Sequence, residues 1–289
     1  MFEKFKEGNV EIRKDEVWER NCRIMKRAGL EIDRQEDFKE IIEKDCIFCT
    51  KDKLAKFDFG FMENSHSFLF PNINPYAKYS GVCAFKNHYI KPEEFSAELL
   101  ESNFLLCSEY IENFYDGKAR YASINWNYLM PAGASILHPH TQVVLSEYPT
   151  TYMEKIIKNK DKFFSYIEEE IKGDRFIGKI NGFYLFVPFA PFGFNEVFGF
   201  CKEENEVEKL ALVISKILSY YSSIRRNSFN LAVFIDMDKE FPTHFRILTR
   251  QNMVKYYRND AMFFERIHFE TILEKMPEEV AKEIREFMK

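Results

Sequence analysis

The chain has 289 residues, with 41 lysines and arginines against 46 aspartates and glutamates, and a formal net charge of -5. Its hydrophobic fraction of 46% and aromatic fraction of 17% exclude a disordered chain. Charges of both signs are spread along the whole sequence, which argues against nucleic-acid binding. No apolar run approaches the ~20 residues of a membrane span, and no apolar segment typical of a signal peptide is present. We therefore expect a cytoplasmic protein that binds small ligands and neither nucleic acid nor a membrane.

The first part of the chain predicts strands and one long helix. Residues 1–45 are charged and contain a plausible helical stretch from Trp18 to Met25. Strands are predicted at 67–71 and 81–85, followed by a helix that Pro92 begins and Gly117 ends. A further strand at 120–129 leads through a short loop into the segment 133–144. These elements predict a sheet covered by a helix.

The second part of the chain repeats this order. After a helix that Pro149 and Thr150 begin and Gly173 ends, the segment 183–191 resembles 67–75. A helix at about 203–225 then corresponds to the one after Pro92. A strand at 230–236 follows, and 243–250 stands where the segment 133–144 stood. We predict two tandem half-domains, 1–172 and 173–289, and a last helix that begins at Pro277.

The segment 133–144 reads Gly-Ala-Ser-Ile-Leu-His-Pro-His-Thr-Gln-Val-Val and contains the most informative motif. Side chains alternate along a strand, so His138, His140 and Gln142 are expected to project together from one edge. Pro139 lacks a backbone donor, which suits an edge strand or a rim beside a ligand. The small residues 133–135 allow a phosphate to approach the backbone closely. The segment therefore predicts an anion held against a histidine.

Cys46 and Cys49 form a Cys-x-x-Cys pair, at a spacing that lets one tight turn present two thiolates to a Zn²⁺ ion. No second such pair follows, so the remaining ligands should be histidines. His88 and His138 complete a Cys₂His₂ set, which is closed and therefore structural. Four other cysteines are expected to be small core residues in a reducing compartment: Cys22, Cys83, Cys107 and Cys201.

His140 is the candidate nucleophile. Neutral imidazole attacks phosphorus near pH 7 and gives a phosphohistidine-type intermediate. Gln142 can orient the bound phosphate, and residues 133–135 can offer backbone and hydroxyl donors. Two other interpretations of His-x-His stay open, a metal pair and a hydrogen-bonded core pair, although Asn127, Ser135 and Gln142 favour catalysis. His66 and His268 are expected to be ordinary surface or core histidines, and His244 suits packing as well as binding.

Asn127 together with Gly-Ala-Ser-x-x-His-Pro-His-x-Gln resembles the signature of the galactose-1-phosphate uridylyltransferase group of the histidine-triad (HIT) superfamily. The resemblance covers most of the chain, including the Cys-x-x-Cys pair, His88 and the segment Pro188–Ala190. It implies an α+β fold of two tandem HIT-like half-domains, each an antiparallel sheet covered by a long helix. It also implies that His138 binds Zn²⁺ with Cys46, Cys49 and His88, and that His140 becomes nucleotidylated.

By the same resemblance, the phosphates would contact Asn127, Gly133, Ser135 and Gln142, and Glu265 would bind substrate. The implied reaction is ping-pong transfer of a nucleoside monophosphate between sugar phosphates, with a nucleotide sugar or sugar phosphate as ligand. A homodimer is implied because relatives complete the sugar pocket from a partner subunit. Two alternatives remain: a nucleotide-sugar or dinucleoside polyphosphate phosphorylase or hydrolase that uses the same histidine, and a non-catalytic nucleotide-binding protein.

Four departures from the family pattern bear on the substrate. Thr141 stands where the uridylyltransferases usually have glycine, and threonine or serine is commoner in phosphorylase-like members. The N-terminal arm lacks the Asp-Pro-Leu-Thr-Gly sequence of the family. Ile267-His-Phe269 replaces a glycine-rich segment and is expected to put bulk where a hexose would lie. The segment 243–246 has one histidine where a second metal site would need two.

Overall fold

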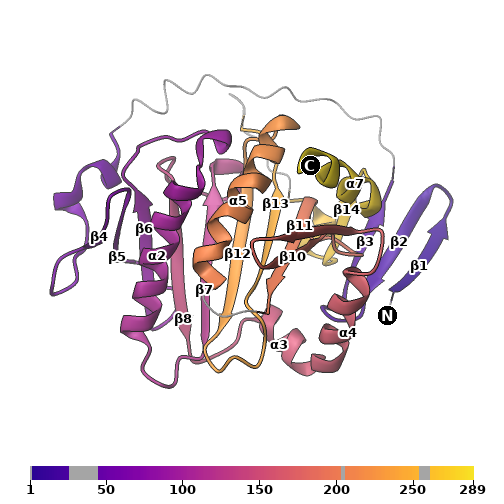
Figure 1. Cartoon of the computed structure of the whole chain (residues 1–289), viewed down its shortest axis with the longest axis horizontal. Coiled ribbons are helices and arrows are strands. Elements are labelled where there is room, and N and C mark those ends of the chain that lie inside the picture. The colour runs from indigo at the N-terminus through magenta and orange to yellow at the C-terminus, as the bar shows by residue number, and fades with distance from the viewer. Residues whose placement is uncertain (1, 26–44, 203–205, 254–260) are drawn as a thin grey trace.

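A ten-stranded antiparallel sheet organises the protein (Figure 1). The computed structural model describes residues 2–25, 45–202, 206–253 and 261–289. Within these ranges the strand order of the large sheet is β4-β5-β6-β8-β7-β12-β13-β11-β10-β9. The strands of its first half are β4 (Met62–Glu63), β5 (Ser67–Pro71), β6 (Tyr79–Phe85), β7 (Tyr121–Tyr128) and β8 (His140–Ser146). Those of its second half are β9 (Phe176–Ile180), β10 (Phe183–Phe186), β11 (Phe194–Cys201), β12 (Phe229–Asp236) and β13 (His244–Thr249).

The two halves of the sheet repeat one pattern, which confirms the predicted tandem α+β fold. The central strands β7 and β12 pair with each other. On their outer sides, β7 pairs with β8 and β12 pairs with β13. Next, β8 pairs with β6 and β13 pairs with β11, so that His140 of β8 lies opposite Ala84 and His244 of β13 lies opposite Phe200. The strands β5 and β10, predicted from the likeness of 67–75 and 183–191, take equivalent places beyond them. A division of the chain after residue 172 stays a prediction.

Two long helices, α2 (Ala97–Phe114) and α5 (Glu206–Ser223), cover one face of the large sheet and pack against each other (Figure 1). Ser96 caps α2, because its side-chain oxygen accepts a hydrogen bond from the backbone N–H of Leu99 at 3.2 Å. The proline predicted to begin this helix instead begins a separate turn, η3 (Pro92–Glu94). The main apolar core lies between these helices and the sheet.

The opposite face of the second half is covered by the N-terminal segment and two shorter helices. Strands β1 (Phe2–Glu7), β2 (Val10–Asp15), β3 (Arg20–Ile24) and β14 (Glu270–Leu273) form a four-stranded sheet beside it. Helices α3 (Thr151–Lys158) and α4 (Lys160–Glu170) complete this layer, which shows that the single helix predicted between Thr150 and Gly173 is divided at Asn159. The last helix is α7 (Pro277–Phe287), as predicted from Pro277. None of the helices in the described ranges is long and apolar enough to cross a membrane.

The prediction of a helical stretch from Trp18 to Met25 was wrong. The carboxylate of Asp15 accepts hydrogen bonds from the backbone N–H groups of Val17 and Trp18, at 2.8 and 3.0 Å, and so ends β2 in a turn. The chain then returns as β3, antiparallel to β2. Buried residues alternate with half-buried ones along β3, which is the two-residue period of a strand.

The histidine segment also differs from its prediction. The strand β8 begins at His140, so His138 and Pro139 lie before it and not within it. β8 pairs with β6 on one side and β7 on the other, so it is an interior strand. Pro139 is therefore placed at the rim before an interior strand, where its missing N–H interrupts no pairing.

Candidate active site and metal centre

The four predicted metal ligands come together. One donor atom from each of Cys46, Cys49, His88 and His138 lies within 4.8 Å of all the others. The Sγ atom of Cys49 is 3.2 Å from Nδ1 of His88 and 3.5 Å from Nδ1 of His138, and Sγ of Cys46 is 3.6 Å from Nδ1 of His138. A tetrahedral zinc ion, with Zn–S of about 2.3 Å and Zn–N of about 2.0 Å, separates sulfur and nitrogen ligands by roughly 3.5 Å. The donor set and its spacing therefore fit zinc.

Local structure orients these donors. The short turn η1 (Ile47–Cys49) folds the Cys-x-x-Cys segment back on itself, with the N–H of Cys49 bonded to the carbonyl of Cys46 at 3.1 Å. The Nε2 atom of His138 is 2.6 Å from the carbonyl oxygen of Phe85, and so Nδ1 is left to face the thiols. Burial lowers the pKa of His138 to about 4, which keeps the imidazole neutral as a ligand must be.

His140 is not part of this cluster. Its Nδ1 is 2.9 Å from the carbonyl oxygen of His138 and donates to it, so Nε2 carries the lone pair. Burial lowers the pKa of His140, which favours the neutral ring. The residue is 7% exposed, and its Nε2 makes no hydrogen bond within the described ranges. The nucleophilic nitrogen is therefore fixed in direction and has no competing hydrogen bond from the described residues.

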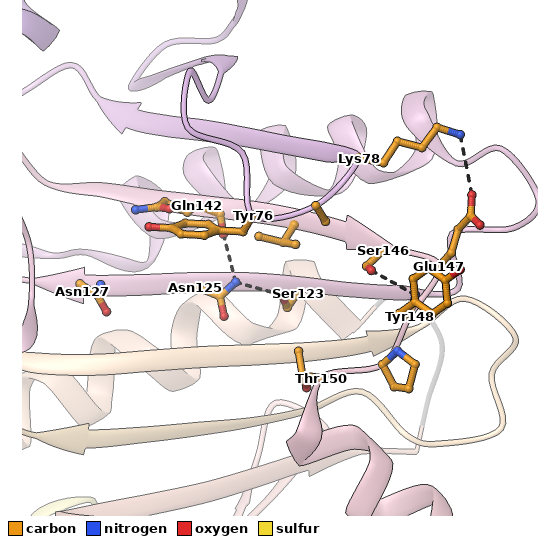
Figure 2. A pocket seen from close by; sticks show the side chains of 13 residues that line it. Tyr76, Lys78, Ser123, Asn125, Asn127, Gln142, Ser146, Glu147, Tyr148 and Thr150 are labelled. Carbon is orange, nitrogen blue, oxygen red and sulfur yellow. Dashed lines mark hydrogen bonds and ion pairs between the residues drawn. The ribbon is translucent and has the colours of Figure 1, made fainter. Parts of the chain in front are cut away.

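A cavity of about 780 Å³ lies on the same face of the sheet as His140 and Gln142. Polar side chains of two adjacent strands form its floor, and Figure 2 shows Asn127, Asn125 and Ser123 in a row along β7. Gln142, two residues after His140, belongs to the same lining. Tyr76 and Tyr148, which are 74% and 79% exposed, also line it. The cavity is thus polar on its floor and aromatic where the rim is exposed.

A chain of hydrogen bonds fixes the side chain of Asn127. Nη1 of Arg250 donates to Oδ1 of Asn230 at 2.8 Å, and Nδ2 of Asn230 donates to Oδ1 of Asn127 at 2.7 Å. An arginine only donates, so each amide in this chain has one allowed orientation. The Nδ2 of Asn127 is then free to face the loop, where it lies 3.8 Å from the position that a Cβ atom on Gly133 would take.

The loop before His138 has an unusual backbone. Leu129 has φ 66° and ψ 166°, a conformation that non-glycine residues rarely adopt. Its carbonyl accepts hydrogen bonds from the N–H groups of Ala132 and Ala134, at 3.1 and 3.2 Å. Gly133 is left-handed with φ 91°, a conformation that glycine adopts without strain. Ser135 is exposed in the same loop.

The second half has an equivalent histidine whose ring is buried by protein. Nδ1 of His244 is 2.9 Å from the carbonyl oxygen of Pro242, as in His140. Its ring packs against Phe198 and Phe234, and its Nε2 is fully buried without a partner. Arg246, in the position of Gln142, pairs with buried Glu196. Of the two interpretations left open for His244, packing and binding, these surroundings favour packing.

Glu265 lies apart from the cavity that contains Gln142. It belongs to the short helix α6 (Phe263–Arg266) and lines a second cavity, of about 280 Å³, with arginines and Asn230. Ile267 and Phe269 are 69% and 65% exposed and line neither cavity, so the expectation that they put bulk at the sugar position stays a prediction.

Thr141 points to the helix side of the sheet. It is fully buried and donates a hydrogen bond to Oδ1 of Asn103 in α2 at 2.6 Å. The departure from the family pattern at this position therefore makes no contact with the cavity.

Sequence reasoning missed Asn230, Arg250 and Arg20. Asn230 could have been found by aligning the two halves. The central strands of the halves pair with each other, and this pairing brings Asn230 opposite Asn127. Arg20 had no such signal, because it enters through a segment that has no counterpart in the repeat.

Comparisons with known proteins agree with this fold. No family model matches the chain. An uncharacterized protein of Archaeoglobus fulgidus is 33% identical over 313 residues, which covers 98% of this chain and 94% of that protein. The structure of an ADP-glucose phosphorylase from Arabidopsis thaliana with bound ADP-glucose superposes with a TM-score of 0.73 at 17% identity, covering 96% of this chain and 99% of that one. A uridylyltransferase structure gives a TM-score of 0.64 at 15% identity, covering 96% and 98%.

These likenesses extend over nearly the whole chain, as two tandem halves require. The chain therefore belongs to the same family as the uncharacterized Archaeoglobus fulgidus protein, and it has the tandem histidine-triad fold of the galactose-1-phosphate uridylyltransferase-like proteins.

Proposed function

We propose that this protein is a nucleotidyltransferase that forms a covalent nucleotidyl-enzyme on His140. The observation that carries the proposal is the orientation of the His140 ring: its Nδ1 is fixed by the carbonyl of His138, and Gln142, two residues later on the same face of the strand, lines a polar cavity. Gln142 and Asn127 belong to that cavity, so amide groups flank the position where a phosphate would meet the histidine. His244 repeats the backbone contact but offers no accessible nitrogen.

In the first half-reaction, Nε2 of His140 attacks the α-phosphorus of a nucleotide sugar or a related diphosphate. A P–N bond forms, and the bond from phosphorus to the bridging oxygen breaks, so a sugar phosphate leaves with the electron pair. The hydrogen bond from Nδ1 to the carbonyl of His138 stabilises the positive charge that the ring acquires. In the second half-reaction, a phosphate oxygen of the acceptor attacks phosphorus and releases the neutral ring.

The metal site would have a structural role. Cys46, Cys49, His88 and His138 would hold one Zn²⁺, and when bound the ion would supply a closed cross-link between the Cys-x-x-Cys turn and the residue two before His140. Phe48, between the two cysteines, packs against the ring of His140 with a centroid distance of 5.1 Å. The site thereby contributes to the position of the nucleophile.

The larger cavity would bind the nucleoside part of the substrate. It extends from Gln142 along β7 and β8, away from the start of the histidine strand. The exposed rings of Tyr76 and Tyr148 are available to stack on a base, a contact that every nucleobase can make. The sequence departs from the family in its N-terminal arm, and a stacking rim would suit a site that tolerates more than one base.

The test is covalent labelling. The protein is incubated with UDP-glucose, ADP-glucose or a dinucleoside polyphosphate carrying a label in the α-phosphate, and acid-labile label on the protein is measured. We expect label on the wild type and none on His140→Asn. Release of the label only to a sugar phosphate supports a transferase, and release to inorganic phosphate identifies a phosphorylase. Tight binding of nucleotide without label would overturn the proposal in favour of a non-catalytic binding protein.

A further inference from the structure

The cavity that contains Glu265 is lined by three arginines, and we call it the arginine cavity. Arg20, Arg250, Arg266 and Asn230 line it together with Glu265. It adjoins the proposed active site, because Asn230 belongs to its wall and Asn127 belongs to the wall of the larger cavity. The two asparagines are joined by the 2.7 Å hydrogen bond, so one pair of side chains separates the two cavities.

Arg20 is a half-buried cation on which the carboxylates of Glu196 and Glu265 act only through longer-range electrostatics. Within the described ranges it makes no ion pair, and its Nε is fully buried without a hydrogen-bond partner. Its guanidinium lies over the ring of Phe192, 4.5 Å from the centroid, which fixes its place in the cavity wall. Other arginines of the same layer are paired with carboxylates, such as Arg175 with Glu170 and Arg246 with Glu196. A half-buried cation without an ion pair of its own is costly, and an anionic ligand would lower that cost.

The other charged residues that line the cavity are two arginines and one glutamate, so their sum is also positive. Arg266 is exposed and makes no ion pair within the described ranges. Arg250 is oriented by its hydrogen bond to Asn230, and Glu265 contributes the single carboxylate of the lining. Among the described residues of the lining, three guanidinium groups and one carboxylate give an excess of positive charge. The planar fork of arginine matches phosphate oxygens in pairs, which makes phosphate the ligand that this lining suits best.

We infer that the arginine cavity binds a phosphate group on the part of the substrate that lies beyond the attacked phosphorus. The inference rests on the proposed function, because it places the attacked phosphorus at His140. Strands lie about 4.8 Å apart, so the two strand spacings from β8 to β12 amount to roughly 10 Å. A sugar ring between two phosphates or a longer oligophosphate can reach across this span. The leaving group and acceptor would then be doubly phosphorylated, and not a simple hexose 1-phosphate.

The test measures binding and does not depend on turnover. Zinc-loaded His140→Asn protein is titrated calorimetrically with glucose 1-phosphate, glucose 1,6-bisphosphate and tripolyphosphate. We expect the bisphosphate or tripolyphosphate to bind at least about tenfold more tightly than the monophosphate, the gain that one charge-assisted hydrogen bond gives. Which of the two binds more tightly distinguishes a sugar bisphosphate from an oligophosphate as the ligand.

Arginine variants assign the gain to the cavity. Arg20→Gln combined with Arg266→Gln should remove the tenfold preference for the bisphosphate or tripolyphosphate over the monophosphate. Lysine in place of glutamine at position 20, Arg20→Lys, should retain part of this preference. Arg226→Gln is the matched control, because Arg226 is also half-buried and makes no ion pair with the described residues, but lines a different cavity. A preference below twofold in the parent, or one that survives the double substitution, overturns the inference. Binding of UMP or AMP by the same proteins tests the larger cavity separately, so failure of the proposed function is recognised on its own.

Discussion

His140 and His244 make the same hydrogen bond from equivalent positions of the two halves: in each, Nδ1 lies 2.9 Å from the carbonyl oxygen two residues earlier. The bond fixes the tautomer of both rings, which leaves Nε2 as the basic nitrogen. The two sites differ in what surrounds that nitrogen. In His244 it is fully buried among aromatic rings, whereas His140 lies two residues before Gln142, which lines a polar cavity. The duplicated fold therefore supplies two oriented imidazoles, of which we propose one for chemistry.

Replacement of His244 should affect stability and not catalysis. We expect His244→Ala to lower the free energy of unfolding by about 2–4 kcal/mol, because it leaves a cavity among packed rings. The rate and extent of covalent labelling should stay within about twofold of the wild type at a temperature where the variant is folded. Denaturant unfolding and labelling of the same preparation check both parts. Loss of label in His244→Ala with an intact fold would show that the second half takes part in the reaction.

The hydrogen-bond chain through Asn230 predicts an order of effects. Aspartate at this position still accepts from Arg250 but cannot donate to Asn127, so the amide of Asn127 should turn and present its oxygen to the phosphate. We expect Asn230→Asp to slow labelling by about tenfold to a hundredfold, the range for a lost donor to developing negative charge. Asn230→Ala does not force the amide of Asn127 to rotate, so it should slow labelling less than Asn230→Asp does. Equal rates for the two variants would contradict the role given to this chain.

Phe48 should couple the metal site to the nucleophile. It is 6% exposed, and its ring packs edge-on against His138 and His140, with centroid distances of 5.7 and 5.1 Å. We expect Phe48→Ala to retain one zinc per chain and to slow labelling several-fold, because the ring of His140 loses a wall. Cys46→Ser should lose both zinc and label. Zinc content by mass spectrometry and labelling rate separate the two variants, and Phe48→Leu is the volume-matched control.

The Cys₂His₂ cluster could be predicted from sequence because each physical requirement is local. A Cys-x-x-Cys turn needs four residues, and tetrahedral zinc then requires two more nitrogen or sulfur ligands. The His-Pro-His motif supplied one, and the structure brings it together with His88. The same locality misled the strand prediction, because alternation was assumed to begin before Pro139, whereas pairing begins at His140 with β6 and at Gln142 with β7. His138 is thereby released to face the thiols.

The arginine cavity could not be predicted, because its residues come from three distant parts of the chain. Arg20 belongs to a strand whose sequence resembles a helix until the turn at Asp15 is known. That strand pairs with β14, more than two hundred residues later in the sequence. Periodicity within one segment contains no information about such a partner. The substrate specificity of this fold is therefore harder to predict from sequence than its nucleophile.

Two carboxylates that pair with Arg175 have pKa values shifted in opposite directions, which predicts a pH dependence of the free energy of unfolding. Burial raises the pKa of Glu170 to about 7 despite its 2.8 Å ion pair with Arg175. Burial also acts to raise the pKa of Glu278, but hydrogen bonds from Arg13 and Arg175 outweigh it and lower the value to about 2. Folded Glu170 retains a proton that the unfolded chain loses near pH 4.5. Its stabilising contribution is therefore complete below that pH and is lost as the pH rises to about 7.

Between pH 5 and 8 the wild type should lose on the order of 1–3 kcal/mol of unfolding free energy from Glu170, and Glu170→Gln should show a smaller slope. Asp15, whose pKa burial raises to about 6, accounts for part of the slope that remains. Glu278 does not titrate in this window, so Glu278→Gln should lower stability throughout it and keep the wild-type slope. Denaturant unfolding at several pH values measures all three proteins. Parallel curves for the wild type and Glu170→Gln would show that burial of Glu170 does not govern its protonation.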